Sequence, residues 1–139
     1  NEELGPALNN ASGINSAVVA ESATGNSPIE LAMQTAYDYS GLRDPARKNF
    51  VVLILDGDNT CTGGSLEQTA VIADNLFKEG IPTYVLGVGS SVVTDETNNI
   101  AVMGGTALAG DPQYYHASSE QSFKDHLRTI FNNIQAHCL

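Results

Sequence analysis

An unbroken apolar stretch in the middle of the chain predicts its central β-strand. Residues 50–55 read Phe-Val-Val-Leu-Ile-Leu, and Asp56, Gly57 and Asp58 follow directly. A short run of this kind that stops at an Asp-Gly pair is typical of a strand buried on both faces of a parallel sheet. Open α/β sheets bind their ligands at the carboxyl ends of such strands. We therefore expect Asp56 to lie at the functional edge of the sheet.

Helical patterns and shorter apolar runs alternate along the rest of the chain. Strands are predicted over residues 81–87 and 114–116, and a weak pattern near residues 14–22 predicts a short helix. Four stronger helices are indicated by Ile29, Met33, Ala36 and Tyr37; by Leu66, Ala70, Ala73 and Phe77; by Ile100, Ala101 and Met103; and by Phe123, Leu127, Ile130 and Ile134. This alternation predicts a parallel α/β sheet in one domain over residues 1–139, with 1–13 as a weakly structured lead-in.

Three of these helices carry sequence signals for their N-termini. Ser27 is expected to cap a helix that begins at Pro28, because Ser favours the N-cap and Pro the first helical position. Ser65, with Gln68 three residues later, predicts the start of the next helix. Thr94 is expected to cap a shorter one. Ser27 thus has a structural role whether or not it also contributes to a binding site.

Composition narrows the range of partners. Six Lys and Arg residues face 16 Asp and Glu residues, a formal charge of -10, so nucleic acid and anionic membrane surfaces are unfavourable partners. No apolar run approaches the roughly 20 residues of a transmembrane helix, and no basic-then-apolar leader opens the chain. Cys61 and Cys138 are either two free thiols or one long-range disulfide. Their even number slightly favours an oxidised, exported protein.

Oxygen-bearing side chains follow the central strand. Asp56, Asp58 and Thr60 offer carboxylate and hydroxyl oxygens, which are the ligands that Mg²⁺ and Ca²⁺ prefer. The alternative is that Asp56 and Gly57 form only a turn and that Asp58 caps it. Because the group ends a predicted buried strand, we favour a functional role for Asp56. The hydroxyl of Ser27, at a helix start beside the same edge, is a further candidate ligand.

Other motifs carry little chemistry. Residues 87–89 read Gly-Val-Gly but lack the third glycine of a dinucleotide fingerprint, because residue 92 is Val. The chain has no Gly-x-Ser-x-Gly elbow and no phosphate-binding loop. His116, His126 and His137 lie far apart in the sequence, and we expect structural or surface roles for them.

Several segments together resemble a known family. They are Thr24–Met33, similar to a Gly-Gly-Thr-Pro segment; Phe50–Cys61, similar to a strand that ends in Thr-Asp-Gly; Gly80–Gly89, similar to the strand after it; and Ile100–Gly105 and Tyr114–Ala117, similar to the surroundings of the last strand. In this order they resemble the von Willebrand factor type A (VWA) domain of exported bacterial proteins over about residues 14–139. The resemblance implies a Rossmann-like, three-layer sandwich.

The resemblance also implies a metal-ion-dependent adhesion site that holds Mg²⁺, Mn²⁺ or Ca²⁺ and grips a carboxylate of a partner. Ser27 and Asp56 match the second and third segments of that site, and Asp58 is a candidate outer-shell residue. The first segment, Asp-x-Ser-x-Ser, is absent. Residues 38–41 imitate it, but they follow a helical pattern and are succeeded by Leu42 where Ser is required, so we reject them.

Further implications concern parts of the family pattern outside this sequence. In the family, strand 1 lies beside strand 4, which residues 50–55 resemble here. The N-terminal strands are missing from this sequence, so we expect an unpaired edge at 50–55, covered by the missing N-terminal part of the same chain or by a partner that adds a strand. The resemblance further pairs Cys61 with Cys138 in a disulfide and implies an extracellular or cell-surface location.

The interpretation is therefore a non-enzymatic, adhesion-type module that binds a protein or surface ligand. One alternative is a haloacid-dehalogenase-like phosphatase with Asp56 as nucleophile, Asp58 as general acid/base and Mg²⁺ between them. That motif normally opens the first strand of its domain, and the later acidic pair that should hold the metal is missing after the strand at residues 81–87. Lys78 is a possible basic residue for this reaction. A second alternative is a metal-free structural or assembly domain, because Ser27 and Asp56 alone hold Mg²⁺ poorly.

Overall fold

A three-stranded parallel sheet forms the centre of the computed structural model, which describes residues 10–20 and 25–136. The strands are β1 (Val51–Leu55), β2 (Thr83–Val88) and β3 (Tyr115–Ala117), in the order β1-β2-β3. Leu53 pairs with Val85, and Leu86 pairs with Tyr115. All three strands therefore end at one edge of the sheet, as the sequence predicts.

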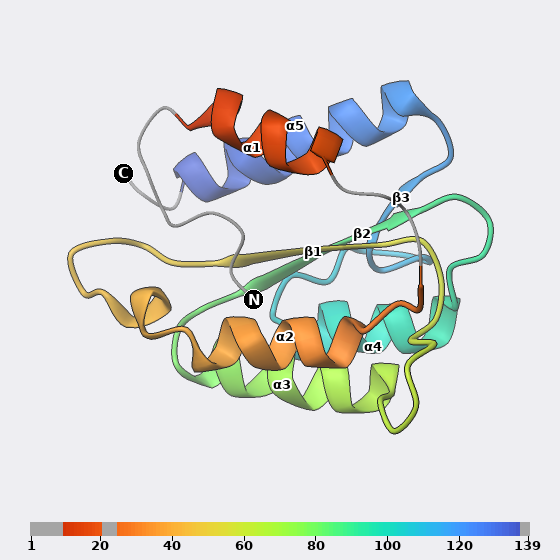
Figure 1. The fold of residues 1–139 in the computed structure, drawn as a ribbon, viewed down its shortest axis with the longest axis horizontal. Helices are drawn as coiled ribbons and strands as arrows, with labels where there is room; N and C mark the ends of the chain where they lie inside the picture. Colours follow the sequence, from red (N-terminus) through yellow and green to blue (C-terminus); the bar gives the residue numbers. More distant parts are fainter. Residues whose placement is uncertain (1–9, 21–24, 137–139) are drawn as a thin grey trace.

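Helices cover both faces of this sheet and make the three layers of an α/β sandwich (Figure 1). Helices α2 (Ile29–Asp38), α3 (Leu66–Lys78) and α4 (Thr94–Met103) lie on one face. Helix α5 (Glu120–Ala136) packs on β2 and β3 from the other face. A short 3-10 helix, η1 (Ser40–Arg43), follows α2. The Rossmann-like arrangement agrees with the predicted fold class.

Side chains of β2 separate two hydrophobic cores. Successive strand residues point to opposite faces, so Val85 joins the core under α2, α3 and α4, whereas Tyr84 and Leu86 join the core under α5. The largest fully buried side chains include Met33, Leu76, Leu86, Ile100 and Ile130. Helical spacing predicts Met33, Ile100 and Ile130, because it records which side of each helix faces the sheet. It does not predict Leu76 on α3.

Details of the helices differ from prediction. Helical spacing places Phe77 inside, yet 47% of it is exposed, and its ring occupies the space that a side chain at Gly105 would need. Pro28 is the N-cap of α2, so Ser27 lies one residue outside the helix and makes no cap. The predicted cap at Thr94 is also wrong, because α4 begins at that residue after Val93. The cap at Ser65 is confirmed by a hydrogen bond from Gln68 N to Ser65 Oγ of 3.0 Å.

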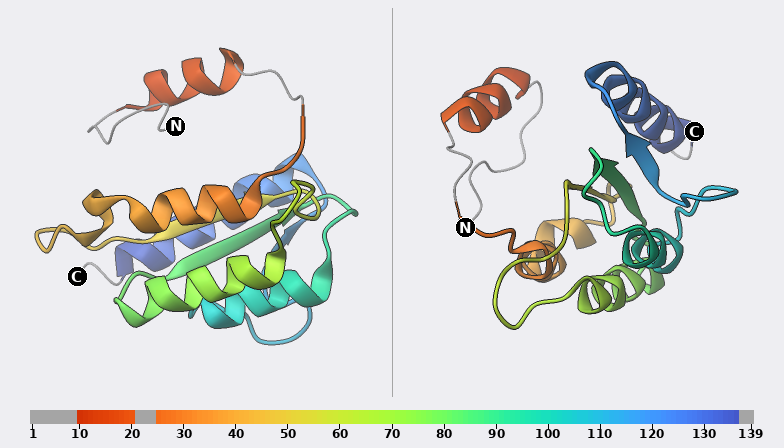
Figure 2. Two further views of the ribbon diagram at one scale, coloured as in Figure 1. Left: turned by 60° about the horizontal axis from the view of Figure 1, so that its bottom comes forward. Right: turned by 90° about the vertical axis from the view of Figure 1, so that its right-hand side faces the viewer.

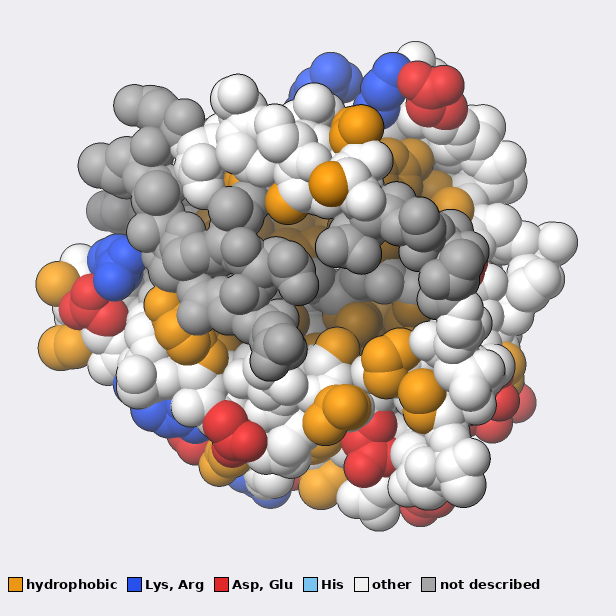
Figure 3. Space-filling model, in the orientation of Figure 1, with side chains coloured by type: hydrophobic (Ala, Val, Ile, Leu, Met, Phe, Trp, Pro, Cys, Tyr) orange, Lys and Arg blue, Asp and Glu red, His pale blue; other side chains and the backbone are white. Residues whose placement is uncertain are grey.

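The outer edge of β1 is the least covered part of the sandwich. Ile54 is 50% exposed, so the prediction that this strand is buried on both faces is wrong. The reason is that α5 packs on β2 and β3 and leaves the corresponding face of β1 open. Within the described residues no strand pairs with the outer edge of β1. Figure 3 views this edge, and hydrophobic side chains are visible on it.

Helix α1 (Ala11–Ala20) stands apart from the sandwich. It has no buried residue and packs on no other described helix or strand. Figure 2 shows it beyond the open face of β1, at a distance from α5. The short helix predicted near 14–22 is therefore present, displaced by a few residues, but it adds nothing to the core.

Candidate functional site

Asp56 lies at the carboxyl edge of the sheet, where the sequence places it. It follows Leu55, the last residue of β1, which pairs with Gly87. The Asp56 side chain is exposed, and no other described residue forms a salt bridge with it. Gly57 lies beside the next loop, because a Cβ added there would be 3.7 Å from Ser91 O. Asp56 is therefore an accessible carboxylate flanked by the loop after β2.

Ser27 and Thr60 bring two distant segments together beside Asp56. The backbone N–H of Ser27 donates to Thr60 Oγ1 over 2.7 Å, and Thr60 N–H donates to Ser27 O over 3.2 Å. This reciprocal pair joins the segment before α2 to the loop after β1. The two segments that the sequence assigns to one site are thus neighbours. Thr60, however, uses its hydroxyl to hold the backbone.

Asn59 is a structural residue that sequence reasoning missed. Its Oδ1 accepts from Glu30 N over 3.4 Å in the first turn of α2, while its Nδ2 donates to Cys61 O over 3.2 Å. Glu30 in turn accepts from Ser65 N over 2.7 Å, ahead of α3. An unpaired N–H at the start of α2 is thereby satisfied from a distant loop. No local sequence signal marks such a cap.

Asp58 uses its carboxylate within the loop. Asp58 Oδ1 accepts from Asn59 N over 2.7 Å, which agrees with the turn-forming alternative for this residue. The side chain is exposed. Its other carboxylate oxygen stays open to the outer-shell role that the family resemblance implies.

The described residues do not by themselves complete a metal site. No group of three or more His, Cys, Asp or Glu side chains among them is placed to hold a metal ion. Asp56 supplies one carboxylate and Ser27 one hydroxyl, whereas Mg²⁺ takes six oxygen ligands and Ca²⁺ six to eight. Residues 38–41 cannot supply the missing ligands, because they lie where α2 ends and η1 begins, at the opposite edge of the sheet.

The structure places Lys78, the possible basic residue of the phosphatase alternative, far from Asp56. Helix α3 leads from the carboxyl end of β1 to the amino end of β2, and Lys78 is its last residue. A helix of 13 residues is about 20 Å long, so Lys78 lies far from Asp56. Lys78 also forms an ion pair with Asp74 on its own helix. It is therefore not placed to act beside Asp56.

Two of the histidines contact backbone carbonyl oxygens near the carboxyl edge of the sheet. His116 Nε2 lies 2.7 Å from Gly89 O, and His126 Nε2 lies 3.0 Å from His116 O. These contacts tie the loop after β2 to β3 and to α5, which agrees with the structural role expected for both. His137 lies outside the described residues.

No disulfide joins Cys61 to another described residue, and Cys138 lies outside the described residues. The predicted pairing of Cys61 with Cys138 therefore stays a prediction. The direction of α5 does not favour it. Its 17 residues run about 25 Å, from the carboxyl edge back to the amino edge, so the helix ends at Ala136 far from Cys61.

Comparison with known families agrees with this geometry. The chain matches the family model of the von Willebrand factor type A domain over residues 7–133, and it therefore belongs to the VWA family. A search of curated proteins finds no match. VWA domains are in general non-enzymatic modules that mediate protein interactions, and many bind a divalent cation. None of the described helices has the length and apolar character needed to cross a bilayer.

Proposed function

We propose that this VWA domain is a non-enzymatic binding module that presents its carboxyl-edge loops, residues 25–28 and 56–64, to a protein or surface ligand. The observation that carries the proposal is the reciprocal hydrogen bonding of Ser27 and Thr60. It fixes two loops from distant parts of the chain beside the exposed carboxylate of Asp56. Loops held on a rigid scaffold in this way are suited to recognition.

The metal-dependent form of this proposal adds a divalent cation bound through Asp56 and Ser27. Such a cation would attract a partner's carboxylate, which an acidic domain with a charge of -10 otherwise repels. It requires oxygen ligands beyond those that the described residues supply. We propose that the missing ligands come from polypeptide outside the described residues or from the partner itself.

Paramagnetic Mn²⁺ tests this form directly. Added to the ¹⁵N-labelled protein, it is expected to broaden the amide resonances of residues 27 and 56–60 first, and Asp56→Asn is expected to abolish that effect. Asp38→Asn is the matched control, because Asp38 is an exposed acid at the opposite edge. Broadening that spreads over the acidic surface and is equal in both variants would reject the site.

A metal-free assembly domain is the second candidate, favoured by the open edge of β1. An apolar strand with unpaired backbone groups invites pairing with another segment. We propose that this edge is covered by the N-terminal part of a longer polypeptide or by a partner that adds a strand. Mn²⁺ titration without localised broadening would favour this candidate over the metal-dependent form.

The phosphatase alternative is tested by hydrolysis of small phosphoesters with Mg²⁺. We expect no turnover, because Asp58 caps its own loop and Lys78 is remote. Phosphatase activity in the wild type that Asp56→Asn abolishes would instead support the phosphatase alternative.

We also propose an extracellular or cell-surface location, because the chain resembles the VWA domains of exported bacterial proteins. The pairing of Cys61 with Cys138 stays a prediction and lends this location no support. Fractionation of the native organism's cells with antibody against the domain tests it.

A further inference from the structure

A cavity of about 230 Å³ lies at the edge of the sheet opposite to Asp56, beside the end of α5. Phe50, Pro82 and Ile134 form apolar walls, and Lys48 and Tyr84 bring polar groups to the lining. Asn49 also lines the cavity, but its Nδ2 donates to the backbone oxygens of Asp44 and Arg47. The cavity is thus a largely apolar pocket in which Lys48 and Tyr84 are the candidate donors to a ligand. Its volume is below the range of about 300–1,000 Å³ for pockets that hold drug-sized ligands, so it suits a smaller molecule.

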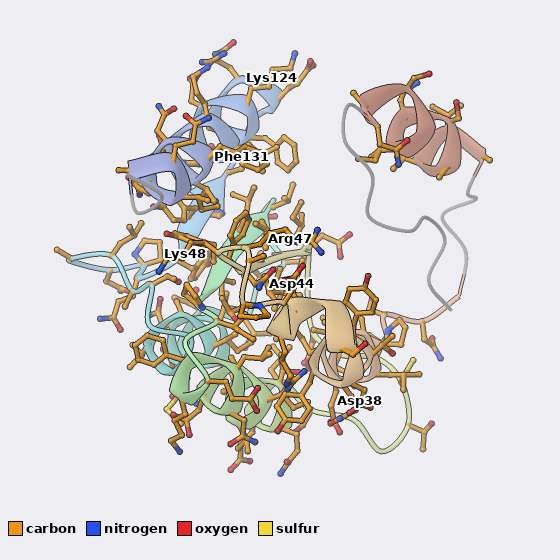
Figure 4. All side chains as sticks on the ribbon, turned by 90° about the vertical axis from the view of Figure 1, so that its left-hand side faces the viewer. Asp38, Asp44, Arg47, Lys48, Lys124 and Phe131 are labelled. Atoms are coloured by element: carbon orange, nitrogen blue, oxygen red, sulfur yellow. The ribbon has the colours of Figure 1, made fainter. Side chains whose placement is uncertain are left out.

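Lys48 supplies positive charge that is not neutralised within the described residues. Its basic neighbours are paired, since Arg43 contacts Glu79 and Arg47 contacts Asp44, each over 2.7 Å. Lys48 forms no ion pair with a described residue. Figure 4 views this edge and shows Lys48 below α5, separated from the pair of Arg47 and Asp44. A protein with a charge of -10 therefore has a local site for an anion.

Tyr84 supplies a second donor from within the core. It is only 7% exposed, and its hydroxyl makes no hydrogen bond to another described residue. The neighbouring Tyr115 differs, because its hydroxyl accepts from Asn133 Nδ2 over 3.1 Å. Among the described residues, the buried hydroxyls that lack a partner belong to Thr83 and Thr97, so the Tyr84 hydroxyl is not one of them. A ligand oxygen in the cavity can accept a hydrogen bond from it.

We propose that this cavity binds a small carboxylate with an apolar body, of the size of a medium-chain fatty acid. The carboxylate accepts from the ammonium group of Lys48 and from the hydroxyl of Tyr84, and the hydrocarbon chain contacts Phe50 and Ile134. A charge-assisted hydrogen bond gives the site its preference for an anion. The apolar walls exclude small hydrated anions, which lose hydration without gaining contacts.

Octanoate is the probe, with octan-1-ol as its uncharged analogue, and binding is followed by NMR on the full chain. Octanoate is expected to shift the resonances of Phe50 and Ile134 saturably and to bind at least about tenfold more tightly than octan-1-ol, as one charge-assisted hydrogen bond allows. Equal affinity for the two probes, or no saturable shift at these residues, would overturn the proposal.

Variants then assign the donors. Lys48→Met keeps the length of the side chain, and it is expected to weaken octanoate about tenfold while leaving octan-1-ol unchanged. Lys124→Met removes an exposed lysine from the opposite end of α5 and is expected to change neither probe. Tyr84→Phe is expected to weaken the binding of octanoate by a smaller factor than Lys48→Met does. If both lysine variants lose the same affinity for octanoate, the effect comes from the overall charge of the protein, and the proposed site is overturned. The cavity and Asp56 lie at opposite edges, so this test is independent of the Mn²⁺ experiment.

Discussion

At the scale of single residues, Asn59 does most to organise the carboxyl edge. Both ends of its amide are used, one on the first turn of α2 and one on the loop after β1. Its side chain also fills the space beside Gly64, where a Cβ would lie 2.5 Å from Asn59 Nδ2. Asn59 therefore connects two segments that are 29 residues apart in the sequence.

Asn59→Ala is predicted to lower the free energy of unfolding by about 1–2 kcal/mol, because two hydrogen bonds of about 0.5–1.5 kcal/mol net are lost. Urea denaturation measures the change. Asn99→Ala, at an exposed position in α4, is the control and is expected to be nearly neutral. Similar losses in both variants would contradict the organising role of Asn59.

Tyr84 leads to a second prediction, for alkaline pH. Burial raises the pKa of its hydroxyl above the usual 10.0, and the nearby Tyr115 raises this pKa further. Between the unfolded and folded pKa values the unfolded chain binds fewer protons, so stability is complete below about pH 10 and falls as the pH rises through the folded pKa.

Tyr84→Phe is predicted to remove this part of the alkaline loss of stability. Urea unfolding of both proteins on either side of pH 10.0 measures it. The stability of wild type relative to the variant is expected to decrease as the pH rises. A difference that stays constant with pH would show that Tyr84 does not titrate differently in the two states.

At the scale of elements, the two serines that the sequence treats alike have different roles. Ser65 caps α3 with its hydroxyl, whereas Ser27 lies outside α2 and is held through its backbone. The start of α2 receives its hydrogen bond from Asn59 instead. A capping motif in sequence thus identifies a helix start, but the acceptor can come from another element.

Ser65→Ala is predicted to cost about 1 kcal/mol of stability, the usual value of an N-cap, and Ser27→Ala less than about 0.5 kcal/mol. Chemical denaturation of both variants measures the contrast. If Ser27→Ala is as destabilising as Ser65→Ala, then Ser27 and not Pro28 is the N-cap of α2. The same Ser27 variant, being stable, is suited to the Mn²⁺ titration.

At the scale of the whole molecule, the sandwich is well covered at β3 and open at β1. Helix α5 protects β2 and β3, and no described segment pairs with the outer edge of β1. Exposed apolar residues lie around this edge, among them Ile54 on β1 and Phe131 on α5, whose ring Figure 4 shows pointing towards α1. Uncovered edges with apolar neighbours promote association.

The isolated chain of 139 residues is therefore predicted to self-associate as its concentration rises, and Ile54→Lys to reduce this. Sedimentation velocity measures it. Val102→Lys is the control, because Val102 is similarly exposed at 47% but lies on α4. A monomer at all concentrations, with slow hydrogen exchange in β1, would show that the edge is already protected.

Much of the architecture was predictable from the sequence because it depends on local periodicity. Residues 50–55, 81–87 and 114–116 are strands to within one or two residues, and apolar spacing selects the buried faces of α3 and α5. A strand and its following Asp-Gly also place Asp56 at the carboxyl edge, since all strands are parallel. These features follow from backbone geometry and burial, which each segment records on its own.

Tertiary structure alone decided the features that depend on two distant segments. The pairing of Ser27 with Thr60 and the cap from Asn59 join residues about 30 positions apart, and no local pattern encodes them. The direction of α5 separates its end from Cys61, and its position over β2 and β3 leaves Ile54 exposed. Periodicity states which face of an element is apolar. Only packing determines whether another element covers that face.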